Sequence, residues 1–562
     1  MMTPSPPRLR PVSLDCCFDQ GSGWQAIPAA QAFEGIGLRY SVSDGERVHI
    51  DPDSGQLWVA TGTPHDGKTV RVRAQNDAGT AEADILIVVE DDGSSRATLR
   101  AAREIEIDDV TIRFNRPVEY GHFISGGNGA GDPFVIGPVT VESYSPGPVQ
   151  TPQGRVMNGA MLNPSCRTEV GFDSLTAQDV YRPELNAGLQ LPLRLEPGDA
   201  LIICISNPAA TSSRETAVKF VILTCVAEAP FEDSFRPPYS GPDRPIWRLS
   251  DIRTDRLLEL PGVGRRLGAE ERDQYRSRLS RFVLDIAPTW NRDHLSSSQH
   301  VPLYGRDLCN QEGEPFLWIH GTYPIEDKVD ILISLVQNGI DRYGVFQSAR
   351  RQNFHPWRPD GAHHGGRKFS ILHAGHLLDD PGMLSIMDQS QALDGEFHED
   401  GQTFYVTQDV VDLTNSAEWR PPYAGDDTRP KQPYEAAMIG IPDWRGKALL
   451  QESNAAWTGH PYRVSGNHNA QHAQVLLLLA LGLREAWGHE AYFDYHMRFC
   501  EIIANRPDPW RFQDRQNAIY DPVEGSRPIE GWEDWQRRWR SELSWQMLMA
   551  YRNTYYSWPW AS

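Results

Sequence analysis

The chain has 562 residues, which corresponds to three or four domains at about 150 residues each. Hydrophobic residues make up 40% and charged residues 23%, a composition typical of a globular protein rather than a disordered or fibrous one. The net charge of −21 would repel a nucleic-acid backbone, and the longest apolar run, residues 475–481, is far below the roughly 20 residues that span a bilayer. Nucleic-acid binding and membrane insertion are therefore excluded as functions, whereas a local basic cluster still allows an anionic substrate.

The N-terminal end carries two arginines but no apolar stretch after them, so no secretory signal is recognised in residues 1–17. The sequence by itself therefore predicts a cytoplasmic location, with non-classical export as the alternative. The seven cysteines include no C-x-x-C pair and are expected to be mostly reduced and buried. A disulfide between Cys204 and Cys225 is the exception that an oxidising compartment would allow.

Residues 1–92 are predicted to form an all-β sandwich. The stretches LRYSVS, LWVAT, KTVRVRAQN and ADILIVVE alternate apolar and polar residues with the period of two that a half-buried strand requires. The turns PDSG and NDAG fall among these stretches. This order resembles the Ig-like and cadherin-like modules that are appended to many bacterial surface and glycan-active proteins. Such modules are spacers or weak binders more often than catalysts.

Residues 93–232 are predicted to form a second all-β sandwich, of jelly-roll type, with a face that could bind carbohydrate. Six strand-like stretches, among them ALIICIS and VKFVILTCV, are separated by loops rich in Gly and Pro. The Pro-rich segment FRPPYSGPDRP then predicts a linker over residues 233–246.

From Trp247 onward the spacing of apolar residues becomes helical. The stretches 329–336 and 475–483 are apolar nearly all round, so other helices must enclose them. We therefore expect residues 247–562 to form an all-α (α/α) toroid, in which outer helices shield inner ones, with an irregular bundle as the alternative. The predicted fold is multidomain: two all-β sandwiches followed by an all-α toroid.

Polar residues gather in three loops, each of which precedes or enters a strongly apolar helical stretch: 317–328, 353–368 and 457–472. Inner helices of a toroid run parallel, so these loops are predicted to meet at one face. The helix N-termini would add partial positive charge and free N–H groups there, which favours an anion.

The second loop contains DGAHHGG, where small residues around His363 and His364 let backbone and imidazoles approach a ligand closely. Arg367 and Lys368 follow at the helix start, against the usual preference for acids in a first turn. Such a departure from local preference hints at a functional position. The structural alternative is that both cations pair with Asp379, Asp380 or another exposed carboxylate.

The third loop contains SGNHNAQH, in which His468 and His472 lie one helical turn apart on the same face. Asn467 or Asn469 could cap the helix, which explains one asparagine but not both. Four further residues supply a stacking ring, a titratable group, a hydroxyl and a fixed cation: Trp457, His460, Tyr462 and Arg463. Such side chains suit a sugar-binding cleft, and a buried polar network is the alternative.

The expected helices are accompanied by the stretches NFHPWRPDGAHHGGRK, SGNHNAQHA and REAWGHEAYFDYHMRF. With this helical layout, the sequence resembles the toroidal polysaccharide lyases, the group that includes alginate lyases and heparinase II/III-like enzymes. The resemblance covers roughly residues 247–562 and implies β-elimination at a uronic acid, hence an anionic polysaccharide or oligosaccharide as substrate. In that family Asn or Arg neutralises the C5 carboxylate, His or Tyr removes the C5 proton, and Tyr or His protonates the leaving oxygen. Family members are typically secreted, and the missing signal departs from that pattern.

The resemblance implies these roles for residues of this chain. The base candidates are His363, His364 and His468. The candidates for neutralising the carboxylate are Asn353, Asn467 and Arg367. The candidate proton donors are Tyr405, Tyr462, Tyr555 and Tyr556. The remaining residues predicted to bind substrate are His355, Trp357, Asp360, Trp457, His460, Arg463 and His472. This chemistry suits the residues, because a base near neutral pH and fixed donors to a developing dianion are what proton abstraction beside a carboxylate requires.

Three alternatives remain open. A glycoside hydrolase on the same toroid would use two carboxylates, and the acids near the predicted cleft are Glu326, Asp327, Asp341, Asp360 and Asp494. No cofactor is required for the lyase reaction, although His373 and His376, three residues apart on a helix, make a divalent metal compatible with the sequence. A non-catalytic carbohydrate-binding protein is the third alternative, supported by the Trp-rich tail at 531–560.

Overall fold

The computed structural model describes residues 5–12, 14–19, 24–43, 48–60, 65–90, 95–126, 131–166, 169–176, 180–213, 216–262, 268–280, 282–286, 305–359, 361–416, 436, 439–440, 442–443, 463–504 and 540–557. Of these described residues, 36% are helical and 27% lie in strands. None of the described helices is both long and apolar enough to cross a membrane.

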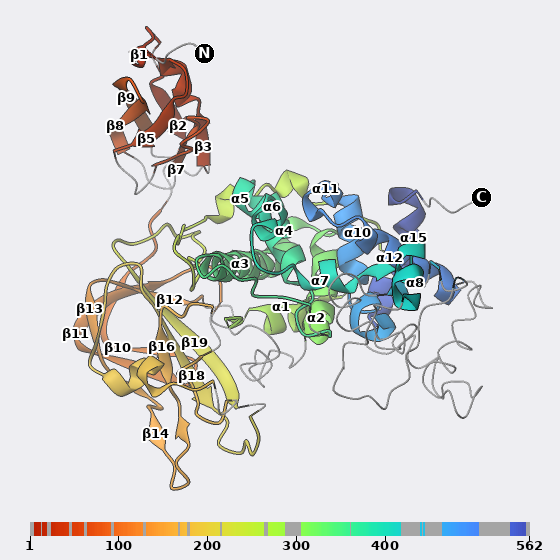
Figure 1. Cartoon of the computed structure of the whole chain (residues 1–562). Coiled ribbons are helices and arrows are strands. Elements are labelled where there is room, and N and C mark those ends of the chain that lie inside the picture. The colour runs from red at the N-terminus through yellow and green to blue at the C-terminus, as the bar shows by residue number, and fades with distance from the viewer. Residues whose placement is uncertain are drawn as a thin grey trace, which may run out of the picture.

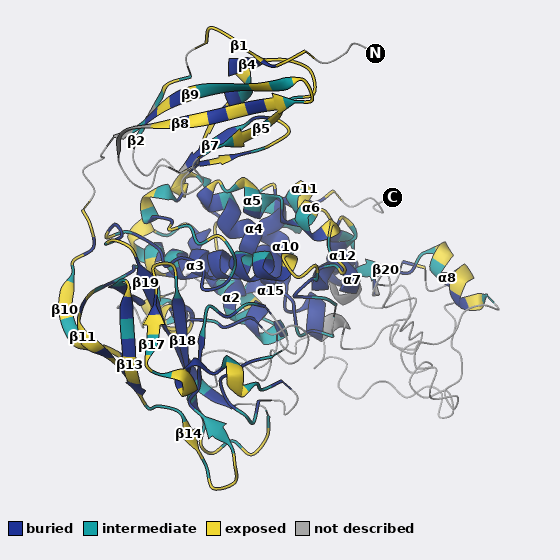
Figure 2. Cartoon of the chain, turned by 60° about the vertical axis from the view of Figure 1, so that its left-hand side comes forward, coloured by how far each residue is buried: buried dark blue, intermediate teal, exposed yellow. Residues whose placement is uncertain are grey.

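The N-terminal part is a β-sandwich of two sheets. One sheet has the order β2-β9-β8-β5 and the other the order β3-β7-β6, with a short β1-β4 pair beside them. The elements are β1 (Arg8–Leu9), β2 (Cys16–Asp19), β3 (Trp24–Ile27), the 3-10 helix η1 (Ala29–Ala32), β4 (Phe33–Glu34), β5 (Arg39–Val42), β6 (Val48–Ile50), β7 (Leu57–Ala60), β8 (His65–Asn76) and β9 (Gly79–Glu90). Alternate residues such as Ile27, Val70 and Ile85 fill a core shared by the two sheets. Figures 1 and 2 show this sandwich standing apart from the rest of the chain.

The second β region is one curled mixed sheet of eight strands, a half-barrel, and not the two-sheet jelly roll that we predicted (Figure 1). Its order is β16-β18-β19-β12-β11-β13-β17, with β10 added beside β11; β12 and β19 are parallel, and the other neighbours are antiparallel. The strands are β10 (Arg100–Ile107), β11 (Val110–His122), β12 (Pro133–Ile136), β13 (Val139–Ser145), β16 (Ala160–Leu162), β17 (Leu193–Leu195), β18 (Ala200–Ser206) and β19 (Ala217–Val226). A hairpin, β14 (Val149–Gln150) and β15 (Val156–Met157), and two 3-10 helices, η3 (Pro183–Leu185) and η4 (Ala187–Gln190), complete this region.

Both faces of β18 and β19 are buried, which explains the error in the sandwich prediction. Leu201 and Ile203 belong to the core inside the curl, whereas Ile202 and Cys204 pack against residues of the helical part. A strand covered on both sides reads as a continuous apolar run, as in ALIICIS, rather than as an alternation. The two core faces also separate Cys204 from Cys225. Both thiols are free and buried, as expected for most of the cysteines, and the exceptional disulfide between these two is not formed.

The helical part contains α1 (Ala269–Leu279), α2 (Gly305–Ile319), α3 (Ile325–Arg350), α4 (Arg367–Leu378), α5 (Pro381–Leu384), α6 (Ile386–Gln391), α7 (His398–Gln402), α8 (Gln408–Asn415), α10 (His472–Ala480), α11 (Arg484–Trp487), α12 (Ala491–Ala504) and α15 (Glu542–Tyr555). Shorter elements are the 3-10 helices η5 (Leu249–Asp251) and η6 (Thr254–Arg256), the π-helical turn η10 (Arg463–His468), and the strands β20 (Phe404–Tyr405) and β21 (Pro442–Asp443). Helices α3, α4 and α10 are buried over most of their length (Figure 2).

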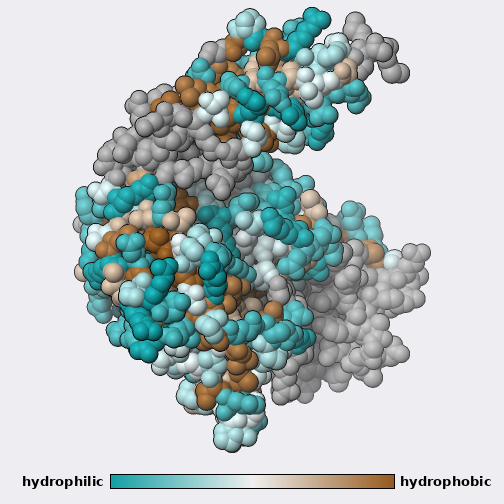
Figure 3. Space-filling view, turned by 90° about the vertical axis from the view of Figure 1, so that its left-hand side faces the viewer, coloured by the Kyte–Doolittle hydropathy of each residue, from teal (hydrophilic) through white to brown (hydrophobic). Residues whose placement is uncertain are grey.

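The prediction of two all-β domains followed by an all-α toroid is wrong. The half-barrel and the helices share one hydrophobic core, in which Phe172, Phe220 and Ile222 of the sheet region pack with helical residues. The predicted linker is also buried: residues 234–240 lie in the interior between these parts. Figure 3 views the half-barrel side, where hydrophobic side chains gather over the half-barrel within a largely hydrophilic surface.

Helices α2 and α4 run in the same direction. Gly305, at the start of α2, packs against the His363 carbonyl just before α4, and Phe316, near the end of α2, contacts the rings of Phe369 and His373. Gln474, in the first turn of α10, lies beside Gly366, the N-cap of α4. The starts of α2, α4 and α10 therefore lie together, and they position the residues described next.

Candidate functional site

Two of the three predicted loops come together at the starts of α4 and α10. His364 precedes α4, His398 begins α7, and Asn467 lies in the π-helical turn before α10. The rings of His364 and His398 are 6.5 Å apart between centroids, and His398 Nε2 lies 2.9 Å from Asn467 Oδ1. We call this group the imidazole cluster, and its members are His364, His398, Asn467, His468, His472 and His496. All six side chains are fully buried.

His398 orients the carboxamide of Asn467. Burial lowers the pKa of His398 to about 3, so the ring is neutral at physiological pH and its Nε2–H donates to Asn467 Oδ1. The carboxamide nitrogen of Asn467 then points away from His398, and it has no hydrogen-bond partner among the residues that the structure describes. A buried donor without an acceptor is costly and points to a ligand.

His364 is held in one tautomer by the backbone. Its Nδ1 lies 2.6 Å from the carbonyl oxygen of Arg358, and a carbonyl can only accept a hydrogen bond. Nδ1 therefore carries the proton, and Nε2 carries the lone pair. An imidazole fixed in this way is prepared to accept a proton at Nε2.

Three imidazoles form a chain behind Asn467. The Nε2 atoms of His472 and His468 are 3.1 Å apart, and the Nδ1 atoms of His468 and His496 are 3.0 Å apart. Burial lowers the pKa of all three, to about 3 for His496, so the chain is neutral and each contact pairs an N–H with a lone pair. Both ring nitrogens of His468 are engaged, so this residue stabilises the cluster rather than serving as the predicted base.

Tyr492 and Glu399 add a phenol and a carboxyl group to the same region. The Tyr492 ring lies 4.5 Å from that of His496. Burial and then the nearby Glu399 raise the pKa of Tyr492 well above 10, so the phenol keeps its proton. Burial also raises the pKa of Glu399 to about 7, although one of its carboxyl oxygens accepts a hydrogen bond from the Gly366 N–H at 2.6 Å. The Tyr492 hydroxyl has no partner within the described part of the chain.

Arg367 and Lys368 pair with buried rather than exposed carboxylates. Arg367 Nε donates to Asp285 at 2.9 Å, and its Nη1 donates to the carbonyls of His363 and Gly365. Lys368 Nζ lies 2.6 Å from Asp400. Most donors of Arg367 are therefore occupied, and its guanidinium fixes the backbone of residues 363–366.

The other predicted substrate-binding residues do not all reach the cluster. His355 and Trp357 pack among Phe346 and Phe397 in the aromatic core, while Asn353 is exposed at the start of its loop. Tyr405 stacks on Phe404 and faces the Arg498 guanidinium. Tyr556 donates a hydrogen bond to Asp494, and Tyr555 lies beside Tyr551. Asp360, Trp457, His460, Tyr462 and the side chain of Arg463 lie outside the described residues.

The first predicted loop forms a different contact. Leu258 N–H donates to His320 Nδ1, so His320 Nε2–H donates to His373 Nε2 at 2.9 Å, midway along α4. His373 Nε2 therefore accepts a hydrogen bond from His320, whereas His376 is half-exposed near Arg256. Among the residues that the structure describes, no group of three or more His, Cys, Asp or Glu is arranged to hold a metal ion.

The acids named for a hydrolase are dispersed. Asp341 pairs with Arg236 and Asp327 with Arg272, and the two acids are about 21 Å apart along α3. Asp494 accepts from Tyr556, Glu326 is exposed, and Asp360 is not described. These described acids each have a separate environment and do not form the predicted carboxylate pair.

Sequence reasoning did not select His398, Glu399, Asp400, Tyr492 or His496. The motif HEDG, which directly follows Phe397, could have indicated a functional position. Its four residues are all polar or small, so they do not show the regular apolar spacing of a helix that packs against a core. Tyr492 and His496 lie four residues apart on α12, the spacing of one helical face, within a stretch that we read only as a resemblance.

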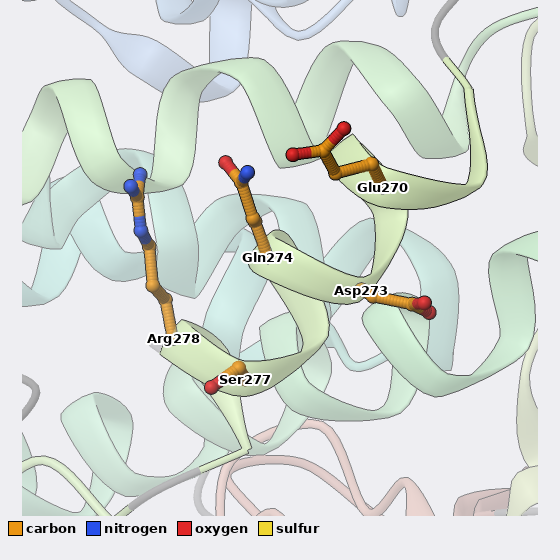
Figure 4. A pocket seen from close by; sticks show the side chains of 5 residues that line it. All are labelled: Glu270, Asp273, Gln274, Ser277 and Arg278. Carbon is orange, nitrogen blue, oxygen red and sulfur yellow. The ribbon is translucent and has the colours of Figure 1, made fainter.

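A surface hollow of about 710 Å³ lies along α1 and is shown in Figure 4. Glu270, Gln274 and Arg278 follow one another on the same helix face, with Asp273 and Ser277 beside them. All five side chains are exposed, so the hollow lacks the buried, convergent groups of the imidazole cluster.

Comparisons with known proteins identify no family. No protein-family model matches the sequence, and no curated protein matches it. Among solved structures, a candidate α-galactosidase from Bacteroides fragilis is similar at 18% identity and a TM-score of 0.13, covering 15% of this chain and 17% of that one. A chain from a complex of titin M10 with an obscurin-like 1 Ig mutant is similar at 19% identity and a TM-score of 0.13, covering 16% of this chain and 97% of that one. A SusE-like polysaccharide-binding protein of Bacteroides thetaiotaomicron is similar at 11% identity and a TM-score of 0.16, covering 41% of this chain and 35% of that one.

Proposed function

We propose that the chain is a polysaccharide-degrading enzyme, a lyase that cleaves uronic-acid-containing glycans by β-elimination. The observation that carries the proposal is the hydrogen bond of 2.9 Å between His398 and Asn467, which leaves the buried amide nitrogen of Asn467 as a donor for a ligand. The ring of His398 neighbours that of His364, whose Nε2 carries a lone pair because Nδ1 donates to the Arg358 carbonyl. The combination matches the two needs of the reaction, a donor to the carboxylate and a base for the adjacent proton.

In the proposed reaction, Asn467 donates from its carboxamide nitrogen to the C5 carboxylate, and His364 Nε2 removes the C5 proton. The carbon–oxygen bond at C4 then breaks, and the leaving oxygen takes the proton of the Tyr492 hydroxyl. The phenol suits this step because its raised pKa keeps it protonated until an alkoxide develops. Passing the proton from His364 back to Tyr492 restores the site and balances the reaction.

His398 and the three-imidazole chain act as positioning residues. His398 fixes the carboxamide of Asn467, and His468 anchors the turn that carries Asn467 to α12 through His496. The catalytic side chains are fully buried, so substrate access requires the residues that cover the cluster to move aside.

The test is turnover on a panel of uronate polymers, followed by the ultraviolet absorbance of unsaturated ends and by reducing-end release. We expect unsaturated ends with at least one polymer. We also expect His364→Gln to lower kcat by about 10²- to 10⁴-fold, the typical contribution of a positioned base. The melting temperature should stay close to that of the parent protein, because glutamine retains a donor toward the Arg358 carbonyl.

His122→Gln is the matched control, since the same substitution on β11 lies outside the imidazole cluster and should leave turnover unchanged. Reducing ends without unsaturation would contradict the lyase proposal and favour a hydrolase that uses Glu399 as its acid. Polymer binding without either product would favour a non-catalytic carbohydrate-binding protein.

A further inference from the structure

A second hollow, of about 550 Å³, lies where the half-barrel meets the end of α3. It is lined by the loop after β16, the turn before β18, the segment 241–244 and the end of α3 at 348–352. Its volume is within the range of about 300–1,000 Å³ that small-molecule sites occupy. We call it the junction pocket.

The walls of the junction pocket are fixed to one another. Gly241 has a φ of +97°, and a Cβ there would lie 2.6 Å from the carbonyl oxygen of Gly344, so this backbone approaches α3 as only glycine allows. From the opposite wall, Cys166 N–H donates to Ser348 Oγ, and Gln352 donates to the Cys166 carbonyl, both at 2.9 Å. The pocket is therefore preorganised rather than a chance gap between loops.

Two arginines line the junction pocket without a carboxylate partner among the described residues. Arg244 donates to the carbonyls of Gly198 at 2.7 Å and Tyr239 at 3.3 Å, and burial lowers its pKa. Arg351, the residue after α3, is exposed, and its guanidinium makes no hydrogen bond or ion pair with the described part of the chain.

The one acid in the lining is already engaged. Asp199 accepts from the Asn163 carboxamide at 2.5 Å and from the Glu196 N–H at 2.8 Å. The lining therefore carries one net positive charge on a chain whose net charge is −21. A local reversal of sign in a concave surface concentrates anions.

We propose that the junction pocket binds an acidic monosaccharide unit, with Arg351 and Arg244 holding its carboxylate. A planar guanidinium matches a carboxylate with two parallel hydrogen bonds. Asn163, Ser165 and Gln352 supply polar groups for ring hydroxyls, and proline rings in the lining supply apolar contact for the sugar face. The site is separate from the imidazole cluster and does not depend on the proposed elimination.

Binding of free glucuronate to the full chain tests the proposal, because this probe contains no glycosidic bond to cleave. Calorimetry or ligand-observed NMR should show saturable binding that weakens at least tenfold in Arg351→Ala. Arg350→Ala is the matched control. It removes the same charge from the neighbouring residue, whose guanidinium bonds instead to Gln347 and Gln389. Its affinity for glucuronate should equal that of the parent protein.

Glucose and inorganic sulfate complete the test. We expect both to bind at least tenfold more weakly than glucuronate, since one lacks the charge and the other the ring. The proposal is overturned if no probe saturates, if glucose binds as tightly as glucuronate, if sulfate binds equally well, or if Arg350→Ala weakens binding as much as Arg351→Ala. None of these outcomes bears on whether the chain is a lyase.

Discussion

The ammonium group of Lys368 sits in the interior beside two neighbouring acids but neutralises only one of them. It lies 2.6 Å from Asp400 and 4.2 Å from the Trp487 ring centroid, and it is fully buried. Glu399 instead accepts a hydrogen bond from the backbone N–H of Gly366 at 2.6 Å. A buried carboxyl without a cation of its own holds its proton to higher pH. The Glu399 carboxyl near Tyr492 therefore ionises at a higher pH than an ordinary glutamic acid.

Glu399→Gln should remove a pH-dependent cost of folding. The pKa of Glu399 rises from 4.5 to about 7 in the folded state, so stability falls as the pH rises from 4.5 to 7 and then levels off. The substitution should therefore leave stability nearly unchanged at pH 4.5. At pH 8 it should raise the free energy of unfolding by about 3 kcal/mol relative to the parent. Urea denaturation at both pH values measures this difference.

Glu326→Gln is the matched control. Glu326 is an exposed side chain on α3, so this substitution should change the free energy of unfolding by less than about 0.5 kcal/mol. An equal effect of Glu399→Gln at pH 4.5 and pH 8 would show that Glu399 is already ionised in the folded protein.

At the scale of elements, the segment 234–240 joins the half-barrel to α3 through one guanidinium. Arg236 donates to Asp132 at 2.8 Å, to the Pro237 carbonyl at 3.0 Å and to both oxygens of Asp341 on α3. Ser125 Oγ completes the link by donating to Gln337 at 2.6 Å. Every charge in this network is buried, so its partners depend on one another.

Asp341→Ala should lower the free energy of unfolding by about 3–5 kcal/mol, since it leaves the Arg236 charge buried and incompletely paired. Asp388→Ala, an exposed substitution on α6, should change it by less than about 0.5 kcal/mol. Guanidinium denaturation measures both. Replacing Arg236 and Asp341 together by Met and Leu should recover much of the loss. A loss below 1 kcal/mol in Asp341→Ala would mean that the ion pair does not hold the segment in place.

The success of sequence reasoning also differs from element to element. Period-two alternation found β5, β7, β8 and β9, because each has one buried and one solvated face. The same reading predicted the wrong sheet arrangement for β18 and β19, because helices far along the chain cover the second face of these strands. Composition predicted a linker over residues 233–246, of which 234–240 are buried. Prolines also suit an irregular buried segment whose carbonyls an arginine satisfies.

In the candidate site, too, the sequence predicted some residues but not the contacts between them. Loop chemistry drew attention to His364 and Asn467, which the structure brings into one cluster. Their connection runs through His398, which begins α7, a short helix that the sequence reading did not identify. The partners of Arg367 and Lys368 were also unpredictable, since Asp285 and Asp400 are distant in sequence and unremarkable in an acidic chain.

At the scale of the whole molecule, the N-terminal sandwich and the remainder differ in how they depend on their neighbours. The core of the sandwich is a cluster of its own, whereas the half-barrel shares its outer core with the helices. Within the described residues, none of the hydrogen bonds or ion pairs that we identify joins residues 5–90 to residues 95–557. The sandwich should therefore fold and unfold independently.

Deleting residues 1–92 should leave the melting transition of the remainder unchanged within about 2 °C, and the isolated sandwich should melt separately in calorimetry. A chain that starts at residue 247 should instead be insoluble, because it exposes the surface that covers Phe220 and Ile222. A soluble, cooperatively folded 247–562 fragment would contradict the shared core.

The parallel pair at the centre of the half-barrel constrains how the chain is made. Phe134 of β12 pairs with Thr224 of β19, 90 residues later, and β19 in turn needs helices that follow it. During synthesis the first strands of this sheet must wait for most of the polypeptide to leave the ribosome before their second face is covered. Nascent chains that stop short of the helices should therefore recruit holding chaperones, and expression yield should depend more on translation speed after residue 226 than before it.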